Sequence, residues 1–524
     1  MERKVGIIGA GVSGLLACKY TVSKGFVPMV FESQSSIGGV WRKTLEATKL
    51  QTPKPLFQFS DFSWPTSVTE QVPNQHQIFD YLQSYAHHFD LLRHISFNCK
   101  VVGISYEGPS DEEEEEDDMQ AWSLWGGTGE PFSSKGKYWS LTVEDTLTLQ
   151  TKVYQVDFVI LCVGRFSDVP NIPEFPPNKG PEAFHGKVLH SMDYAAMDDT
   201  SAVELVKGKR VVVVGFEKSA VDIAAQCSTA NGVEHPCTVL YRTEHWHMPD
   251  FLAWGVPLPY LYFNRFAELL VHKPGEGFLL SLLATILSPL RWGFSKFVES
   301  HIKRKLRLEK FGMVPKHGFL KDFSSWTLAI LPEDFYDKVE KGSIELKKAM
   351  SSFSFYREGI LINGETEPLE TDIVILATGF RGETKLKDIF VSSTYQDIIA
   401  GHTDMPVPLY RECIHPRIPQ LAIIGFSESY SNLSISEIRC RWVTELLDGT
   451  FNVPGIEEME KDVKNWGAYF KQSSGQNYRR SCIGALQTWY NDQLCKDMGW
   501  KPKRKKGFVA ELFEPYGPMD YAQP

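Results

Sequence analysis

Three features of this 524-residue sequence predict an α/β fold made of two interleaved, Rossmann-like dinucleotide-binding domains. A strand, a glycine-rich turn and a helix open the chain at Val5, and a second unit of the same kind follows Lys209. Buried strands that begin near Asp372 and Leu421 return after the second unit. They are expected to complete the first sheet, so that the second domain interrupts the first.

The first unit carries the pattern G-x-G-x-x-G between two apolar strands. In such a turn the first glycine permits the tight bend, the second lets backbone approach a pyrophosphate, and the third lets the helix pack on the sheet. The helix N-terminus favours phosphate, and Glu32 follows the second strand where a ribose hydroxyl needs an acceptor. A turn without a ligand is the alternative, but the complete context favours a dinucleotide site at Gly9, Gly11, Val12, Ser13, Gly14 and Glu32.

The composition is that of a globular protein, with 43% apolar and 23% charged residues. The net charge of -10 comes largely from the eight consecutive acids Asp111–Asp118, so it indicates a solvated loop rather than a class of partner, and nothing indicates nucleic acid. Nine scattered cysteines without a C-x-x-C pair indicate reduced thiols in a cytoplasmic chain. The first strand begins at Val5, which leaves no room for a signal peptide ahead of it.

One apolar run, Phe278–Leu290, is too short for a bilayer span of about 20 residues. A buried helix is the simplest interpretation, and an element on a membrane surface is the alternative. No metal site is predicted.

Further candidates follow the first unit and its neighbouring strands. The glycine pair before Gly39-Val40-Trp41 lets backbone approach a flat cofactor that the indole can cover. A strand from Val156 ends at Gly164, and later strands end at Thr378-Gly379 and at Gly425. Ligands of doubly wound folds bind at such carboxyl ends of strands.

The second unit departs from the glycine pattern, because Glu217 stands at the second glycine position. Lys218 or Arg210 is expected to offset its charge. Arg242 follows the next strand where the first unit has its acid, and a cation there suits a 2′-phosphate and favours NADPH over NADH. The candidate NADPH site comprises Gly215, Lys218, Ser219, Ala220 and Arg242, and a unit without a nucleotide is the alternative.

These features divide the chain into four parts. The first domain occupies 1–170, with an unstructured insertion at about 107–136, and resumes with C-terminal helices at 341–524. A linker is expected at 171–204, and the second domain at 205–340 with an apolar insert at 251–335.

Several motifs together resemble the flavin-containing monooxygenases along essentially the whole chain. The first glycine turn matches the family's FAD motif, and Gly38–Trp41 matches its GGxW. Phe184–Tyr194 fits the signature FxGxxxHxxxY, Ala377–Phe380 resembles ATG(Y/F), and Ser436–Trp442 resembles the SELQARW helix.

The resemblance implies an FAD domain interrupted by an NADPH domain. NADPH would reduce FAD, O₂ would add at flavin C4a, and the hydroperoxide would pass its outer oxygen to a nucleophilic nitrogen or sulfur of a small molecule. Gln51 falls where many members have an asparagine near the flavin ring, so it is the candidate catalytic residue, and a structural amide is the alternative.

The resemblance extends to one branch of the family. Gln51 and the sequence GFEKSA resemble plant members that act in pathogen defence and hydroxylate the nitrogen of pipecolate. Membrane contact is expected to be at most peripheral, at the surface of the endoplasmic reticulum, and the oligomeric state stays open.

Three other functions compete with this one. A Baeyer–Villiger oxygenase shares the flavin chemistry, but its signature ends in Trp where this chain has Tyr194. A disulfide reductase requires a redox C-x-x-C pair. Glu217 leaves a non-catalytic nucleotide-binding protein as the third alternative.

Overall fold

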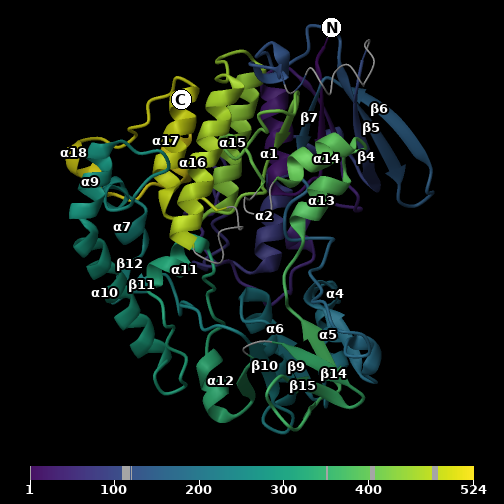
Figure 1. Ribbon diagram of the computed structural model, residues 1–524, viewed down its shortest axis with the longest axis vertical. Helices are drawn as coiled ribbons and strands as arrows, with labels where there is room; N and C mark the ends of the chain where they lie inside the picture. The colour runs from purple at the N-terminus through teal and green to yellow at the C-terminus, as the bar shows by residue number, and fades with distance from the viewer. Residues whose placement is uncertain are drawn as a thin grey trace.

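Two five-stranded parallel sheets form the scaffold of the protein. A computed structural model describes residues 2–108, 119, 121–349, 352–401, 407–474 and 482–523. The first sheet lies in the upper part of Figure 1 with the C-terminal helices, and the second lies in the lower part. This arrangement agrees with the predicted α/β class.

The first sheet has the strand order β18-β7-β1-β2-β3, and all its pairs are parallel. Its central strands are buried on both faces, which explains their continuous apolar runs. Helices α1 (Val12–Ser23) and α15 (Asn432–Leu447) cover one face, and the antiparallel sheet β4-β5-β6 covers the other. The strands are β1 (Lys4–Ile8), β2 (Val27–Phe31), β3 (Ile95–Ser96), β4 (Cys99–Glu107), β5 (Tyr138–Asp145), β6 (Thr151–Val156), β7 (Phe158–Leu161) and β18 (Leu421–Ile423).

The second sheet repeats this plan with the order β13-β10-β9-β17-β8, again all parallel. Helices α5 (Asp199–Val206), α6 (Lys218–Asn231) and α12 (Phe335–Lys341) pack on one face, and the antiparallel sheet β14-β15-β16 packs on the other. The strands are β8 (Lys187–His190), β9 (Val211–Val214), β10 (Cys237–Tyr241), β13 (Ile344–Lys348), β14 (Phe353–Tyr356), β15 (Gly359–Ile362), β16 (Leu369–Glu370) and β17 (Ile373–Leu376).

The predicted boundaries of the second domain were wrong at both ends. Strand β17 pairs with β9 in the register Ile373↔Val211, so it belongs to the second sheet and not to the first. Strand β8, in the predicted linker, is the edge strand of the same sheet. Because both sheets contain short apolar strands that end near a glycine, periodicity does not tell which sheet such a strand joins. Among the strands after 341, β18 is in the first sheet.

The prediction that the insertion at about 107–136 is unstructured is also partly wrong. Its acidic run, Asp111–Asp118, lies outside the described residues. After it, Trp125 is fully buried, and its indole N–H donates to the Ile418 carbonyl at 2.9 Å. A buried tryptophan usually satisfies its one donor in this way, so this part of the expected insertion packs against the protein.

The insert at 251–335 connects the two units. It contains β11 (Leu252–Ala253), β12 (Val256–Pro257), α7 (Pro259–Tyr262), α8 (Arg265–Leu269), α9 (Phe278–Ile286), α10 (Ser288–Leu306) and α11 (Phe319–Ser325), on the left of Figure 1. Arg265 binds Asp492 of helix α17 (Gln487–Asp497) with an Nη2–Oδ1 distance of 3.0 Å. Glu268 accepts the Trp489 N–H at 2.7 Å. The insert therefore ties the second unit to the C-terminal helices.

The run Phe278–Leu290 is not a buried helix as expected. It forms α9 and the start of α10, and Phe278 and Leu279 are each 79% exposed. Ala284 is the buried side chain of α9. Within the described ranges no single helix has the length and apolar composition to cross a membrane, although α9 and α10 meet that test as a pair bent by 48°.

The remaining α-helices and 3₁₀-helices complete the described fold. They are η1 (Gly39–Arg42), α2 (Gln75–His88), η2 (Leu92–His94), η3 (Trp125–Gly127), η4 (Pro181–Ala183), α4 (Ser191–Ala195), α13 (Gly382–Asp388), α14 (Ser393–Ala400), α16 (Ile456–Ser474), η6 (Gly484–Leu486), α18 (Phe508–Phe513) and η7 (Pro518–Tyr521).

Candidate active site

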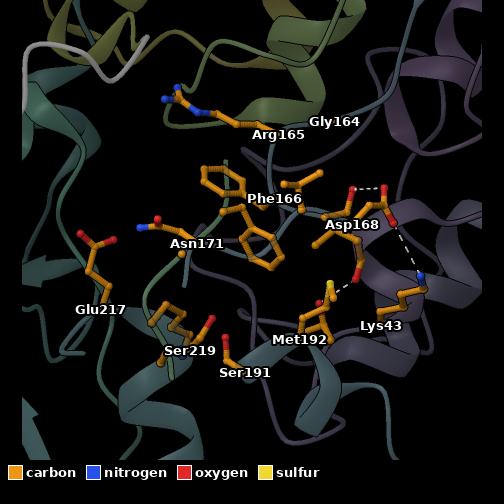
Figure 2. A pocket seen from close by; sticks show the side chains of 18 of the residues that line it. Lys43, Gly164, Arg165, Phe166, Asp168, Asn171, Ser191, Met192, Glu217 and Ser219 are labelled. Carbon is orange, nitrogen blue, oxygen red and sulfur yellow. Dashed lines mark hydrogen bonds and ion pairs between the residues drawn. The ribbon is translucent and has the colours of Figure 1, made fainter. Parts of the chain in front are cut away.

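A cavity of about 2870 Å³ lies between the two units, at the carboxyl ends of both parallel sheets. Small-molecule sites usually measure about 300–1,000 Å³, so this cavity has room for more than one ligand. Figure 2 shows Glu217 and Ser219 of the second unit across the cavity from Arg165. The predicted residues that line it are Gly9, Gly11, Val12, Ser13, Glu32, Gly39, Val40, Trp41, Gln51, Gly164, Gly215, Lys218, Ser219, Arg242, Thr378, Gly379 and Gly425.

Two predicted binding residues, Gly14 and Ala220, are not among the residues that line the cavity. A Cβ on Gly14 would lie 1.9 Å from the Gly9 carbonyl oxygen, so the absent side chain lets α1 pack against the turn. Ala220 lies in the first turn of α6 and is buried in the core. Both residues act through close packing rather than through contact with a ligand.

Backbone alone forms one wall of the cavity in the first unit. A Cβ on Gly11 would lie 3.4 Å from the Cα of Gly39, and a Cβ on Gly39 would lie 3.0 Å from the Cα of Gly11. Gly39 has φ +56, which favours glycine. Nearby, a Cβ on Gly425 would meet Ser13 Oγ at 2.2 Å. Gly11, Gly39 and Gly425, from three segments distant in sequence, thus form a cradle in which these three positions carry no side chain, as the close approach of a pyrophosphate requires.

Glu32 lies at the end of β2, beside this cradle. Its Oε2 accepts the Ala10 N–H at 2.7 Å, and its Oε1 accepts the Gln34 N–H at 2.9 Å. Oε1 also accepts from Ser33 Oγ at 3.3 Å. Because each carboxylate oxygen has about two lone-pair sites, Oε2 retains the capacity to accept a ribose hydroxyl. The buried side chain also joins the glycine turn to β2.

The first glycine of the turn has the same surroundings in both units. A Cβ on Gly9 would lie 2.6 Å from the Cys162 carbonyl oxygen, just after β7. A Cβ on Gly215 would lie 2.4 Å from the Ala377 carbonyl oxygen, just after β17. Both glycines have positive φ, 102 and 134. The same steric demand therefore places a glycine beside the neighbouring strand in each sheet.

The cations expected to offset Glu217 are engaged elsewhere. Lys218 Nζ donates to Asp222 Oδ1 at 2.8 Å and to the Ile330 carbonyl at 3.1 Å. Arg210 binds Asp372 at 2.9 Å, at the opposite end of β9. Arg242 is exposed at the cavity and has no hydrogen-bond or ion-pair partner in the part of the chain that the structure describes. Its guanidinium is therefore available to an anion in the cavity.

Gln51 lines the cavity and is fixed at one end. Its Oε1 accepts the Ile330 N–H at 3.2 Å, from the insert of the second unit. The side-chain NH₂ has no partner among the described residues and can donate to a ligand. The structural role and the binding role of Gln51 are therefore compatible.

The family-signature segment at 184–194 packs the edge of the second sheet. A Cβ on Gly186 would lie 2.4 Å from the Asp372 carbonyl oxygen. His190 Nδ1 accepts the Met192 N–H at 3.1 Å and caps α4, while burial lowers the pKa of its imidazole. The Tyr194 hydroxyl donates to Gln226 of α6 at 2.9 Å. These contacts are structural.

Two chain segments that connect the units cross at the cavity, and sequence reasoning missed their side chains. Asn171 Nδ2 donates to the Thr378 carbonyl at 3.1 Å, and the Asn171 N–H donates to the Gly379 carbonyl at 2.9 Å. Arg165 binds Glu383 at 2.8 Å. Their position just after Gly164, at a strand end, is the signal that could have found them.

A second missed group lies on the wall formed by the second unit. Asp322 Oδ1 accepts hydrogen bonds from His317 Nε2 at 2.7 Å and from His245 Nδ1 at 3.3 Å. Burial alone would lower the pKa of His245, but the hydrogen bond to Asp322 raises it above its usual value. The three ligand atoms lie within 4.8 Å of one another, a geometry that also suits a metal ion. His317 and Asp322 are five residues apart, but His245 lies 77 residues before Asp322, so no short spacing motif contains all three.

Comparison with known proteins assigns the family. A family model described as flavin-binding monooxygenase-like matches residues 2–115 and 128–510. The chain belongs to this family. Probable flavin-containing monooxygenase 1 of Arabidopsis thaliana is 41% identical over 527 residues, which cover 99% of this chain and 96% of the relative.

Two other similar proteins are more distant. Dimethylaniline monooxygenase [N-oxide-forming] 2 of Oryctolagus cuniculus is 25% identical, over 96% of this chain and 84% of the relative. The crystal structure of the OTEMO complex with FAD and NADP has a TM-score of 0.65 at 17% identity, and the match covers 94% of this chain and 97% of that one. This structural likeness shows a common fold.

As a member of this family, the protein is an enzyme, a flavin-binding monooxygenase, as predicted. The residues present fit two dinucleotides. One unit offers the glycine cradle at Gly11 and Gly39, and the other offers Arg242, which has no partner among the residues that the structure describes.

Proposed function

We propose that this flavin monooxygenase transfers one oxygen atom of O₂ to the nitrogen of a small amine, with an amino acid or a cyclic amine such as pipecolate as substrate. FAD binds the first unit, NADPH binds the second, and the reaction serves plant defence. The name of the rabbit relative, which states N-oxide formation, supports nitrogen as the acceptor. The Arabidopsis relative supports the plant branch.

The observation that carries the substrate class is an unsatisfied hydroxyl in an aromatic wall. Tyr430 lines the cavity, and its buried hydroxyl has no hydrogen-bond partner among the described residues. Burial raises the pKa of Tyr430 far above its usual value, so the hydroxyl keeps its proton. A buried hydroxyl without a partner costs free energy, which a polar ligand atom would recover.

Gln51 and the ring of Trp326 belong to the same wall as Tyr430. Thr52, next to Gln51, donates to the Tyr430 carbonyl at 2.8 Å, which places the two segments side by side. Trp326 lines the cavity and lies edge-on to Tyr430, with ring centroids 5.8 Å apart. Aromatic faces attract a protonated amine, while the free amide and hydroxyl groups suit its polar substituent.

The protein's part in the reaction is to bind, orient and exclude water. Hydride transfer from NADPH to FAD and activation of O₂ are the chemistry that the cofactors supply. Gly11 and Gly39 hold the pyrophosphate of FAD, and Arg242 holds the 2′-phosphate of NADPH. Gln51 donates from its amide at the flavin edge. The aromatic wall of Trp326 and Tyr430 limits the access of water.

A substrate screen tests this proposal. Purified enzyme with FAD and NADPH is offered amino acids, cyclic amines and thioethers, and oxygenated products are identified by mass. Products hydroxylated on nitrogen support the proposal. Sulfoxides from thioethers, with all amines untouched, would refute it.

A pair of variants tests the role of Tyr430. Tyr430→Phe is expected to raise the KM for the amine about tenfold, with normal flavin content and an unchanged KM for NADPH. Tyr262→Phe is the matched control, because the Tyr262 hydroxyl is also buried without a partner in the described structure but does not line the cavity. Equal effects of the two substitutions would remove Tyr430 from the site.

A further inference from the structure

Three side chains on the wall formed by the second unit meet at one carboxylate oxygen. His245 follows β10, His317 precedes α11, and Asp322 lies in α11. His317 Nε2 lies 2.7 Å from Asp322 Oδ1, and His245 Nδ1 lies 3.3 Å from the same oxygen. All three residues line the cavity. We call them the histidine–aspartate cluster.

The oxygen at the centre of this cluster faces more hydrogen-bond donors than it can serve. Besides the two imidazoles, the Thr327 hydroxyl donates to Asp322 Oδ1 at 3.0 Å. Each carboxylate oxygen has about two lone-pair sites, so three donors overload it. A cation between the rings and the oxygen removes the conflict, because ring nitrogens that bind a metal carry a lone pair in place of a proton.

A buried tryptophan holds the three groups in position. The Trp246 N–H donates to Asp322 Oδ2 at 2.7 Å, and the indole N–H donates to the His317 carbonyl at 2.7 Å. Trp246 follows His245 directly in the sequence and is 1% exposed. Hydrogen bonds of this kind orient the ligating carboxylate in metal sites. The cluster is therefore a fixed frame and not a chance meeting of surface side chains.

The distances and the charge suit a small divalent cation. Tetrahedral bonds of about 2.0–2.1 Å place any two ligand atoms about 3.4 Å apart. The separation of 3.3 Å between His245 and Asp322 is close to this value. The pair at 2.7 Å must widen by about 0.6 Å, which the His317 side chain, 20% exposed, can accommodate. The carboxylate of Glu217 acts on His245 through its charge and adds negative charge near the cluster.

We propose that the histidine–aspartate cluster binds one Zn²⁺ ion. Two imidazoles and one carboxylate suit Zn²⁺, whereas Mg²⁺ and Ca²⁺ prefer ligand sets made of oxygen. Three protein ligands leave the fourth tetrahedral position open, and this position opens to the cavity that the three side chains line. The ion joins the segment after β10 to the insert and takes water or a ligand oxygen at its open position.

Equilibrium dialysis measures the binding. Full-length enzyme loaded with FAD is freed of metal with a chelator, and the chelator is removed. The protein is dialysed against graded concentrations of Zn²⁺, and bound zinc is measured by elemental analysis. One zinc ion per chain is expected, and a roughly hundredfold excess of Mg²⁺ should leave it bound. Failure to retain zinc, or its displacement by Mg²⁺, overturns the proposal.

X-ray absorption at the zinc edge identifies the ligands in the unmodified enzyme. The nearest atoms are expected at about 2.0–2.1 Å, as nitrogen and oxygen ligands require. A shell of sulfur at about 2.3 Å would assign the ion to cysteine thiolates and overturn the proposal. Because no substitution is involved, this measurement does not depend on the folding of a variant.

Two variants assign the ion to the cluster. Asp322→Asn keeps an acceptor for the Trp246 N–H and removes the charge, and His317→Gln removes one imidazole. Each is expected to raise the Kd for zinc about tenfold or more. His76→Gln is the matched control, because His76 Nε2 lies 3.5 Å from Glu46 in a pair whose side chains are 62% and 48% exposed. It should bind zinc like the unmodified enzyme.

Flavin content and thermal melting establish that each variant is folded. A Kd for zinc that stays unchanged in either cluster variant would overturn the proposal, as would an equal loss of affinity in His76→Gln.

Discussion

Single residues decide how closely a dinucleotide approaches each sheet. A Cβ on Gly11 would lie 3.4 Å from the Cα of Gly39, and a Cβ on Gly39 would lie 3.0 Å from the Cα of Gly11, so neither can carry a side chain without filling the space above the turn. Arg242 contributes in the opposite way, through a side chain that is free of protein partners within the described residues and faces the cavity.

Gly11→Val is expected to abolish FAD binding, because a branched side chain would occupy the position of the pyrophosphate. The measurement is the ratio of flavin to protein after purification. Gly293→Ala is the control, since a Cβ at Gly293 meets no atom within 4 Å. A yellow Gly11→Val protein with normal flavin content would contradict the role of this turn.

Arg242→Ala is expected to raise the KM for NADPH about tenfold or more and to leave the KM for NADH nearly unchanged. The reason is the loss of the cation that pairs with the 2′-phosphate. Arg210→Ala is the control, because Arg210 precedes β9, binds Asp372 at 2.9 Å and does not line the cavity. A similar rise for both nucleotides would exclude the 2′-phosphate role.

At the level of elements, side chains distant in sequence hold the insert against the C-terminal helices. Helix α8 of the insert holds α17 through Arg265 and Glu268. Burial raises the pKa of Glu268 to about 8, which means that the folded state prefers the protonated carboxyl. In an unfolded chain the same group titrates near about 4.3.

The pH dependence of stability follows from this difference. The stability associated with protonated Glu268 is fully present below about pH 4.3 and is lost as the pH rises towards 8. Glu268→Gln keeps the acceptor for Trp489 and removes the titration. The variant is therefore expected to melt a few degrees higher than the unmodified enzyme at pH 8.5, and the difference should shrink at pH 5.5. An equal difference at both pH values would contradict the assignment.

At the scale of the whole molecule, two chain segments connect the units and bind each other. Asn171 on the first connection holds Thr378 and Gly379 on the second, and its Oδ1 also accepts from Arg381 Nε at 3.1 Å. The relative position of the two nucleotide sites depends on this crossing. Hydride transfer between two bound cofactors is sensitive to such geometry.

Asn171→Ala is expected to lower the yield of oxygenated product per NADPH consumed several-fold, with the remaining NADPH yielding H₂O₂. Flavin content should be normal. Product, NADPH and H₂O₂ are measured in one assay. Asn231→Ala is the control, because Asn231 bonds to Gly208 and Val206 within the second unit alone. Full coupling in Asn171→Ala would show that the crossing does not position the cofactors.

The sequence by itself determined the features that depend on near neighbours. The turn at Gly9–Gly14 and the carboxylate at Glu32 belong to the first nucleotide unit, and the cation at Arg242 belongs to the second. Within each unit, spacing along the chain controls spacing in the structure. The α/β class and the two cofactors followed from these units and from the family motifs.

Tertiary structure alone decided which sheet received β17, which partner Gln51 binds and whether α9 is covered. Each of these depends on segments hundreds of residues apart, such as the bond between Gln51 and Ile330. An apolar run indicates only that its side chains avoid water, and it does not indicate which element of the structure covers them. The packing of the whole chain left α9 uncovered, because no element of the described structure crosses it.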